Sequence, residues 1–280
     1  MLRQMTPAVV RIGLGLVVAY LGIVVLAWVF QERLAFPAPR ATVPDPGRAG
    51  FRNGERIALV MKDGTPLVGW FLPGSGGTGH GQPGLLWFYG NGENIGSIWP
   101  ILREFQPRGA ALLVVDYPGY GASGGRTTEA GLYEAADLAY AALRARPEVD
   151  PGRIFVYGRS LGSAAATYTG ATHPVAGLIL ESPFTSARGM ARVHYPFVPR
   201  FLLRLRLDNL AAIRRVHCPL LLFHGTADRL VPVAMGMELA AASAGPREVV
   251  LIQGADHNET YDIGGDYYRE KLAAFVLKSP

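Results

Sequence analysis

The pentapeptide Gly-Arg-Ser-Leu-Gly at residues 158–162 constrains the fold of this chain most strongly, because of what flanks it. Residues 153–157 are apolar, β-branched or aromatic and predict a buried strand, whereas residues 163–168 are small and predict a helix. A serine between two glycines at a strand-to-helix turn is typical of a nucleophile elbow, in which a strained turn exposes the hydroxyl. The glycines are needed because side chains there would collide with the neighbouring strand or helix. Ser160 is therefore the candidate nucleophile.

A nucleophilic serine needs a base, an acid that orients the base, and donors for an oxyanion. Residues 219–224 predict a strand that leads through a glycine turn to Asp228, and residues 249–252 predict one that leads to His257. Both side chains would lie at the carboxyl edge of a parallel sheet, where open α/β sheets keep their sites. We expect Ser160 to attack, His257 to act as general base and then general acid, and Asp228 to hold the imidazole tautomer.

Three other residues compete for these roles. His224 stands at a strand end and is a rival base, while Glu181 ends the strand at 177–181 and is a rival acid. Asp256 precedes His257 in the sequence, but its side chain is expected to point away from the imidazole ring. Asp228 is favoured because a Gly-x-x-Asp turn after a strand fits the usual acid loop.

The oxyanion hole is expected to combine two backbone donors. One is the N–H of Leu161, which follows the candidate nucleophile. The other comes from the loop Gly-Asn-Gly-Glu-Asn at 90–94, whose glycines let the backbone approach a substrate oxygen. Asn91 is the candidate second donor, with an ordinary glycine-rich turn as the alternative.

Six segments resemble the α/β-hydrolase-fold serine hydrolases and occur in that family's order from about residue 51 onward. They are YGNGEN at 89–94, DYPGYGASG at 116–124, GRSLG at 158–162, ESPF at 181–184, HGTAD at 224–228 and DH at 256–257. The closest branch carries an N-terminal membrane anchor and the same GRSLG elbow. Tyr89 departs from the pattern, because members usually have histidine before the Gly-Asn pair. The resemblance implies hydrolysis of carboxylic esters or thioesters, and hence a small-molecule or lipid acyl substrate.

Residues 12–30 form an uncharged apolar run of 19 residues, long enough for a spanning helix. We expect a single-pass anchor over residues 1–32, with its transmembrane part at about 9–30. A cleavable signal peptide is the alternative, although its apolar region is usually shorter and no clear cleavage site follows. Arginines flank the run almost evenly. We prefer a signal anchor that places the catalytic domain on the non-cytoplasmic side.

The rest of the chain predicts one α/β domain over 51–280, joined to the anchor by a stiff, extended proline-rich linker at 33–50. Strands alternate with helices, which predicts a mainly parallel eight-stranded sheet covered on both faces. The expected strands are 55–61, 66–72, 84–89, 110–116, 153–158, 177–181, 219–224 and 247–252. The expected helices are 95–105, 128–146, 160–172, 233–244 and 264–277.

A lid-like insert is expected at 185–216. Its apolar stretch at 193–199 is a candidate lining for an acyl pocket. Residues 200–207 mix arginines with apolar residues and predict a lid helix with snorkelling arginines. Contact of this stretch with an anionic membrane surface is the alternative.

Other classes of function are disfavoured. The net charge of +5 is scattered and forms no stripe suited to nucleic acid. Two G-x-G-x-x-G matches, at 74–79 and 119–124, lack the strand–turn–helix context of dinucleotide binding, and we expect no cofactor and no metal. A peptidase of the prolyl-oligopeptidase-like type and a catalytically idle membrane scaffold are the alternatives to an esterase. The oligomeric state is not predicted.

Overall fold

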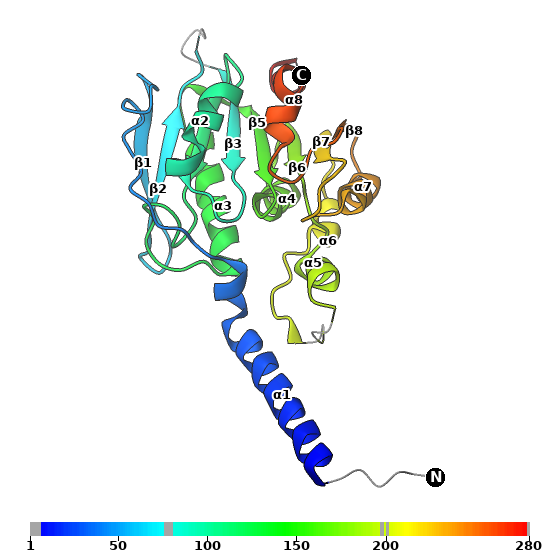
Figure 1. Ribbon diagram of the computed structural model, residues 1–280. Coiled ribbons are helices and arrows are strands. Elements are labelled where there is room, and N and C mark those ends of the chain that lie inside the picture. The colour runs from blue at the N-terminus through cyan, green and yellow to red at the C-terminus, as the bar shows by residue number, and fades with distance from the viewer. Residues whose placement is uncertain (1–6, 76–80, 197–198, 200–201, 279–280) are drawn as a thin grey trace.

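The computed structural model describes residues 7–75, 81–196, 199 and 202–278. A long N-terminal helix, α1 (Pro7–Ala35), leads into an α/β domain built on one eight-stranded sheet (Figure 1). The strands are β1 (Glu55–Val60), β2 (Pro66–Leu72), β3 (Gln82–Phe88), β4 (Ala111–Val115), β5 (Val149–Arg159), β6 (Gly177–Glu181), β7 (Leu220–Gly225) and β8 (Arg247–Ile252). The further helices are α2 (Ile95–Phe105), α3 (Glu129–Arg144), α4 (Gly162–Thr172), α5 (Ala187–His194), α6 (Asn209–Ile213), α7 (Val233–Ala242) and α8 (Thr260–Lys278).

The strand order β1-β2-β4-β3-β5-β6-β7-β8 makes β2 antiparallel to both of its neighbours, and all the other pairs are parallel. Helices cover both faces of this mixed sheet, so the predicted fold class is confirmed. The carboxyl ends of β3 to β8 therefore meet at one edge. Loops that follow β3, β5, β7 and β8 lie next to one another there, and these loops carry the predicted site residues.

The core lies in the central strands. Every residue of β3, β4, β6 and β7 is buried, and apart from Gln82, Glu181 and His224 near their ends these strands are apolar on both faces rather than alternating. This is the pattern of parallel strands covered on both faces, because neither face of the strand meets water. β1 alternates exposed and partly buried residues, as expected for an edge strand.

Several elements differ from their predicted bounds. β5 begins at Val149, which pairs with Gln82 ahead of an irregularity in the register. The Pro-Gly pair at 151–152 is typical of a turn, so the sequence pattern places the start of the strand later. α8 begins at Thr260 and is interrupted at Gly265, whose φ of 48° lies in the left-handed region that favours glycine. α1 continues to Ala35, past the charges that ended the predicted span, because Glu32 and Arg33 are good helix formers.

The insert also differs from its prediction. The helix expected at 200–207 is wrong over residues 203–207, which form neither helix nor strand: Leu205 and Leu207 are buried, whereas Arg204 and Arg206 are exposed. This alternation follows a strand-like period rather than a helical one. Residues 197, 198, 200 and 201, which belong to the predicted pocket lining and lid, lie outside the described residues. The insert instead contributes the short helices α5 and α6.

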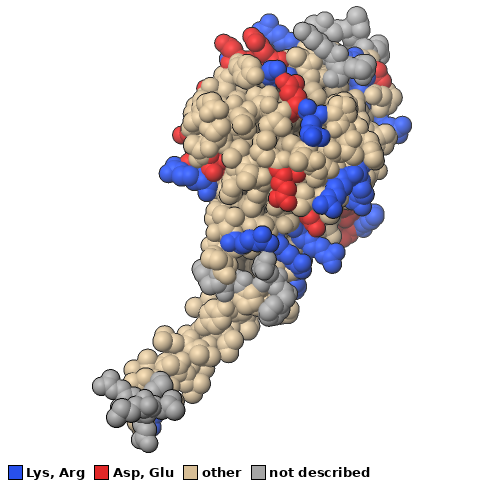
Figure 2. Space-filling view, turned by 90° about the vertical axis from the view of Figure 1, so that its right-hand side faces the viewer, with Lys and Arg blue, Asp and Glu red and all other residues tan. Residues whose placement is uncertain are grey.

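α1 is long and apolar enough to cross a membrane. An 18-residue window of this helix has a mean hydropathy of 2.5, and only 6% of it is buried inside the protein. Figure 1 shows α1 projecting away from the domain, and Figure 2 shows Lys and Arg side chains gathered where the uncharged surface of α1 meets the domain.

The C-terminal end of α1 is attached to the domain by hydrogen bonds. The buried side chain of Gln31 accepts the backbone N–H groups of Arg204 and Leu205 at 2.8 and 3.2 Å. The Arg204 guanidinium lies over the Trp28 ring, 4.7 Å from its centroid. The end of α1 therefore packs directly against the insert.

The proline-rich segment after α1 packs on the domain as well. Phe36, Val43 and Ala49 are at most 5% exposed, and the Gly121 N–H donates to the Pro39 carbonyl at 2.9 Å. The prediction of a stiff, extended linker that lifts the domain from the bilayer is wrong for this segment, which is packed on the domain. Apolar side chains spaced among the prolines bury surface that a free linker would expose.

Candidate active site

Ser160 lies at the turn between β5 and α4, in the geometry that the GRSLG pattern predicts. Its φ of 49° is a left-handed value that costs a non-glycine residue on the order of 1–3 kcal/mol. The flanking glycines are required sterically. A Cβ at Gly158 would lie 2.4 Å from the Gly162 carbonyl oxygen, and one at Gly162 would lie 2.2 Å from the Phe88 carbonyl oxygen. The turn thus holds the Ser160 side chain above the carboxyl edge of the sheet.

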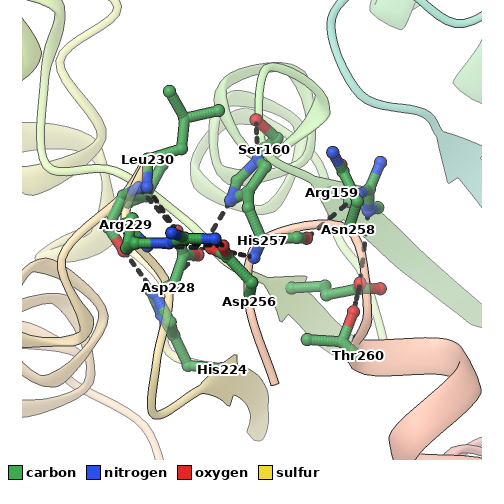
Figure 3. Close-up of polar contacts among 12 residues, drawn as sticks. Arg159, Ser160, His224, Asp228, Arg229, Leu230, Asp256, His257, Asn258 and Thr260 are labelled. Carbon is green, nitrogen blue, oxygen red and sulfur yellow. Dashed lines mark hydrogen bonds and ion pairs between the residues drawn. The ribbon is translucent and has the colours of Figure 1, made fainter. Parts of the chain in front are cut away.

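The structure brings His257 and Asp228 together with Ser160. His257 Nε2 lies 2.9 Å from Ser160 Oγ, and His257 Nδ1 lies 2.8 Å from Asp228 Oδ2 (Figure 3). A carboxylate only accepts, so Nδ1 carries the proton and Nε2 is left to accept the serine hydroxyl proton. His257 is 5% exposed and Asp228 8% exposed, so this chain of contacts is largely withdrawn from water.

Asp228 is surrounded by donors. Its Oδ1 accepts the backbone N–H groups of Leu230 and Val231 at 3.0 and 2.7 Å, while His224 Nε2 lies 3.3 Å from Oδ2. Burial alone would raise the pKa of Asp228, but hydrogen bonds from His224, His257 and Val231 outweigh it and hold the pKa well below its usual range. Asp228 therefore stays an anion beside the imidazole.

His224, the rival base, is fully buried on the other side of Asp228 (Figure 3). Its Nε2 lies 2.9 Å from the Val231 carbonyl oxygen, which can only accept, so Nε2 is the protonated nitrogen. Its Nδ1 has no partner among the described residues and faces Gly236, where a Cβ would approach to 2.5 Å. His224 contacts the acid and makes no contact with Ser160.

The rival acids are engaged elsewhere. Glu181 is fully buried and accepts hydrogen bonds from four side chains. These are the hydroxyls of Tyr157, Tyr268 and Thr260 and the Arg159 guanidinium. Asp256 pairs with Arg229, with 2.8 Å between Oδ2 and Nε, and its side chain is directed away from the imidazole ring as expected.

The oxyanion loop shows where the predicted donors lie. The Asn91 side chain is turned away from the site: it donates to the Ala35 carbonyl at 2.8 Å and accepts the Tyr120 hydroxyl at 2.6 Å. Within the part of the chain that the structure describes, the backbone N–H groups of Asn91 and Leu161 donate to no protein acceptor. Both remain available to an oxygen at the site.

Tyr89, which departs from the family pattern, supports the same loop. Its hydroxyl donates to the buried carboxylate of Asp116 at 3.1 Å and accepts the Tyr117 N–H at 3.0 Å. The Tyr117 hydroxyl donates in turn to the Tyr89 carbonyl at 2.8 Å. These bonds connect the loop after β3 to the loop after β4.

A hollow of about 410 Å³ borders the histidine. It is lined by Arg229, Leu230, Asp256, His257, Asn258 and Glu259. The insert reaches this region, because His194 Nε2 at the end of α5 lies 2.8 Å from the Leu230 carbonyl oxygen. Val193 and Leu230 are 43% and 46% exposed, so apolar surface is available beside the hollow.

The fold is that of an α/β hydrolase, and Ser160, His257 and Asp228 meet at the carboxyl edge of its sheet. The chain belongs to the family that includes the Mycobacterium tuberculosis protein Rv2307c, with which it is 34% identical over 262 residues, or 92% of this chain and 91% of that protein. A family profile described as "Serine aminopeptidase, S33" matches residues 84–214.

A second relative and a solved structure extend this comparison. Alpha/beta hydrolase domain-containing protein 17B of Homo sapiens is 33% identical over 193 residues, which cover 69% of this chain and 65% of that protein. The Pyrococcus furiosus esterase Pf2001 superposes with a TM-score of 0.70 at 20% identity, covering 86% of this chain and 97% of that one. The esterase shares the fold.

Proposed function

We propose that this protein is a serine hydrolase that cleaves carboxylic esters or thioesters through an acyl-enzyme on Ser160. The observation that carries the proposal is the contact chain from Ser160 Oγ to His257 Nε2 at 2.9 Å and from His257 Nδ1 to Asp228 Oδ2 at 2.8 Å. A positioned nucleophile, base and orienting acid in this order are the requirements for activating a serine hydroxyl.

In the proposed reaction, Ser160 Oγ attacks the acyl carbonyl carbon while His257 Nε2 takes the hydroxyl proton. The carbonyl oxygen becomes an oxyanion, which accepts hydrogen bonds from the Leu161 and Asn91 N–H groups. The bond to the leaving group then breaks, and His257 returns its proton to the departing alcohol or thiol. Water repeats the sequence on the acyl-enzyme and releases the acid. Asp228 stays ionised and stabilises the imidazolium in each half-reaction.

Labelling by a fluorophosphonate probe tests this proposal. The wild type should react covalently, and Ser160→Ala should not, because the probe is attacked only by an activated serine. Ser75→Ala is the matched control, since Ser75 is an exposed loop serine outside the site. A folded wild type that the probe leaves unlabelled would contradict the proposal.

We also propose that α1 anchors the protein in a membrane and that residues 51–280 form the catalytic domain. The length and mean hydropathy of α1 support an anchor, and Lys and Arg side chains at its junction with the domain suit the headgroup level on either side of a membrane. The proposed orientation places the domain on the non-cytoplasmic side. Protease digestion of spheroplasts, with and without permeabilisation, checks the orientation. The domain should be cleaved without permeabilisation. Protection until permeabilisation would reverse the orientation.

A peptidase is the second candidate, because the matching family profile is described as a serine aminopeptidase. An aminopeptidase needs an acidic group for the substrate amine, and both acidic residues of the hollow are engaged. Asp256 pairs with Arg229, and Glu259 accepts the Asp256 N–H at 2.9 Å. A panel of acyl esters and thioesters of increasing chain length, run beside aminoacyl amides, separates the two activities. Turnover confined to the amides would favour the peptidase.

A further inference from the structure

Arg159, the residue between Gly158 and Ser160, is buried at the centre of the site rather than exposed on the turn. Its side chain is 5% exposed and makes four polar contacts with three separate segments. Nη1 lies 2.5 Å from Glu93 Oε1, and Nε lies 3.2 Å from Glu181 Oε1. Nη2 donates to the His257 carbonyl at 3.1 Å and to Asn258 Oδ1 at 2.6 Å.

The charge of Arg159 is balanced locally. An isolated buried cation is very costly, and a buried pair is tolerated only where geometry and hydrogen bonds compensate for the lost hydration. Burial would lower the pKa of Arg159, but the carboxylates of Glu181 and Glu93 outweigh it and raise the pKa above its usual range. The guanidinium is therefore a permanent cation held between two anions.

Glu93 transmits this contact to the oxyanion loop. Its Oε1 binds Arg159, while its Oε2 accepts the Gly90 N–H at 2.6 Å. The space at Gly90 is filled by the same pair: a Cβ there would lie 2.9 Å from Arg159 Nη1 and 3.0 Å from Glu93 Oε2. The Tyr89–Gly90 peptide, one residue before Asn91, is thus held by the Glu93 carboxylate, which Arg159 of β5 binds in turn.

The other end of the guanidinium holds the base loop. Nη2 binds the backbone carbonyl of His257 itself, so the main chain that carries the imidazole is fixed relative to the strand that carries Ser160. Asn258 supplies a second acceptor from the next residue. One planar side chain, bonded through three nitrogens, thereby connects nucleophile, base and oxyanion loop.

We propose that Arg159 is a positioning residue that fixes the oxyanion loop, through Glu93, and the His257 loop relative to Ser160. This inference rests on the proposed hydrolase function. Arg159 is enclosed behind the turn and touches no reacting atom, so it acts by placement. It holds the Asn91 N–H and the imidazole at the correct positions relative to Ser160 Oγ. A misplacement of about 1 Å can cost on the order of 10²-fold in rate.

Arg159→Lys tests the placement while retaining the charge. A lysine ammonium is a compact point charge and cannot reach Glu93, Glu181 and the His257 carbonyl together. We expect kcat on a p-nitrophenyl ester to fall roughly 10- to 100-fold with KM changed less than about twofold, because an oxyanion contact acts mainly in the transition state. Rates are expressed per active site, counted by fluorophosphonate titration of the full chain in detergent.

Arg146→Lys is the matched control. Arg146 likewise bonds two carboxylates, those of Glu55 and Glu148 at 2.9 Å each, but it lies at the edge of the sheet away from Ser160. Both variants lose fork-like contacts and should lower the melting temperature. Only Arg159→Lys should lower kcat per titrated site, which a purely structural role would not do.

Glu93→Gln supplies a second measurement if Arg159→Lys does not fold, because the Glu93 side chain is 23% exposed and its replacement is isosteric. A neutral amide holds Arg159 and the Gly90 N–H less firmly, so we expect a fall in kcat of roughly tenfold. A wild type that labels with the probe, together with folded variants that keep wild-type kcat, would overturn the positioning role alone. A folded wild type that does not label would overturn the hydrolase function and this inference together.

Discussion

Asp228 is held as an anion by donors on three sides, and this determines how its removal should act. In Asp228→Asn, the amide places a donor where His257 Nδ1–H needs an acceptor, so the imidazole is pushed into the wrong tautomer. We expect kcat/KM to fall on the order of 10⁴-fold while probe labelling slows in parallel. Steady-state kinetics on a titrated preparation measures it. An Asp228→Asn variant within tenfold of wild type would remove Asp228 from the triad.

The lowered pKa of Asp228 also predicts a dependence of stability on pH. The folded-state pKa lies below the unfolded value of about 3.9, so the contribution of the carboxylate is fully present above that value and is lost as the pH falls toward the folded-state pKa. The difference in melting temperature between wild type and Asp228→Asn should therefore be constant from about pH 7 to pH 5 and shrink below about pH 4. Thermal scans across this range test the sign. A difference that grows in acid would contradict it.

At the residue scale, the sequence predicts the candidate triad but not the residue that organises it. Ser160, Asp228 and His257 each follow a recognisable strand, so their order along the chain is enough to bring them to one edge. The choice between Asp228 and Glu181 is decided by tertiary contacts, since Glu181 ends β6 and Asp228 follows the end of β7 by three residues, so both lie at that edge. Arg159 escapes notice because its partners, Glu93, Glu181 and His257, are distant in sequence.

At the scale of elements, α4 packs so closely against β5 and the end of β3 that one added methyl group should change the stability of the fold. Gly162→Ala would place a Cβ 2.2 Å from the Phe88 carbonyl oxygen, a backbone atom that cannot move aside cheaply. We expect a loss of unfolding free energy of about 3 kcal/mol or more, or no folded protein. Denaturant titration followed by circular dichroism measures it.

Gly170→Ala on the same helix is the control with the opposite expected sign. A Cβ there would meet its nearest neighbour, Val216 Cγ2, at an ordinary 3.5 Å. Alanine restricts the unfolded chain and favours the helix, so we expect a gain of about 0.5–1 kcal/mol. Equal effects of the two substitutions would contradict the packing described for the elbow.

The elements that sequence patterns predict best are those whose environment is uniform. The mainly apolar sequences of β3, β4, β6 and β7 reflect burial on both faces and predict strands directly. The start of β5 depends on pairing with Gln82, and residues 204–207 depend on hydrogen bonds to Gln31 and Glu129, all far along the chain. Residues 203–207 offered apolar and cationic residues in alternation, and only burial against α1 and the domain distinguishes a strand-like period from a helical one.

At the scale of the whole molecule, the contact between α1 and the insert should contribute measurable order. Gln31→Ala removes the acceptor of the Arg204 and Leu205 N–H groups, and a buried donor left unsatisfied, as at Leu205, costs about 1–3 kcal/mol. We expect hydrogen exchange of these two amides in full-length protein to accelerate roughly tenfold or more. Leu34→Ala is the control, because Leu34 is 70% exposed on the same helix. Unchanged protection in Gln31→Ala would contradict the contact.

The attachment of α1 has a consequence for how substrate and enzyme meet. A catalytic domain on a flexible tether reaches over a distance that grows roughly with the square root of the tether's length. Here the helix end is bonded to the insert through Gln31 and to the oxyanion loop through the contact between Asn91 and Ala35, and the segment that follows is packed down. These contacts hold the end of α1 against the domain. With α1 across a bilayer, Ser160 would sit at a constant height above the lipid, and the substrate would have to carry its scissile bond to that height.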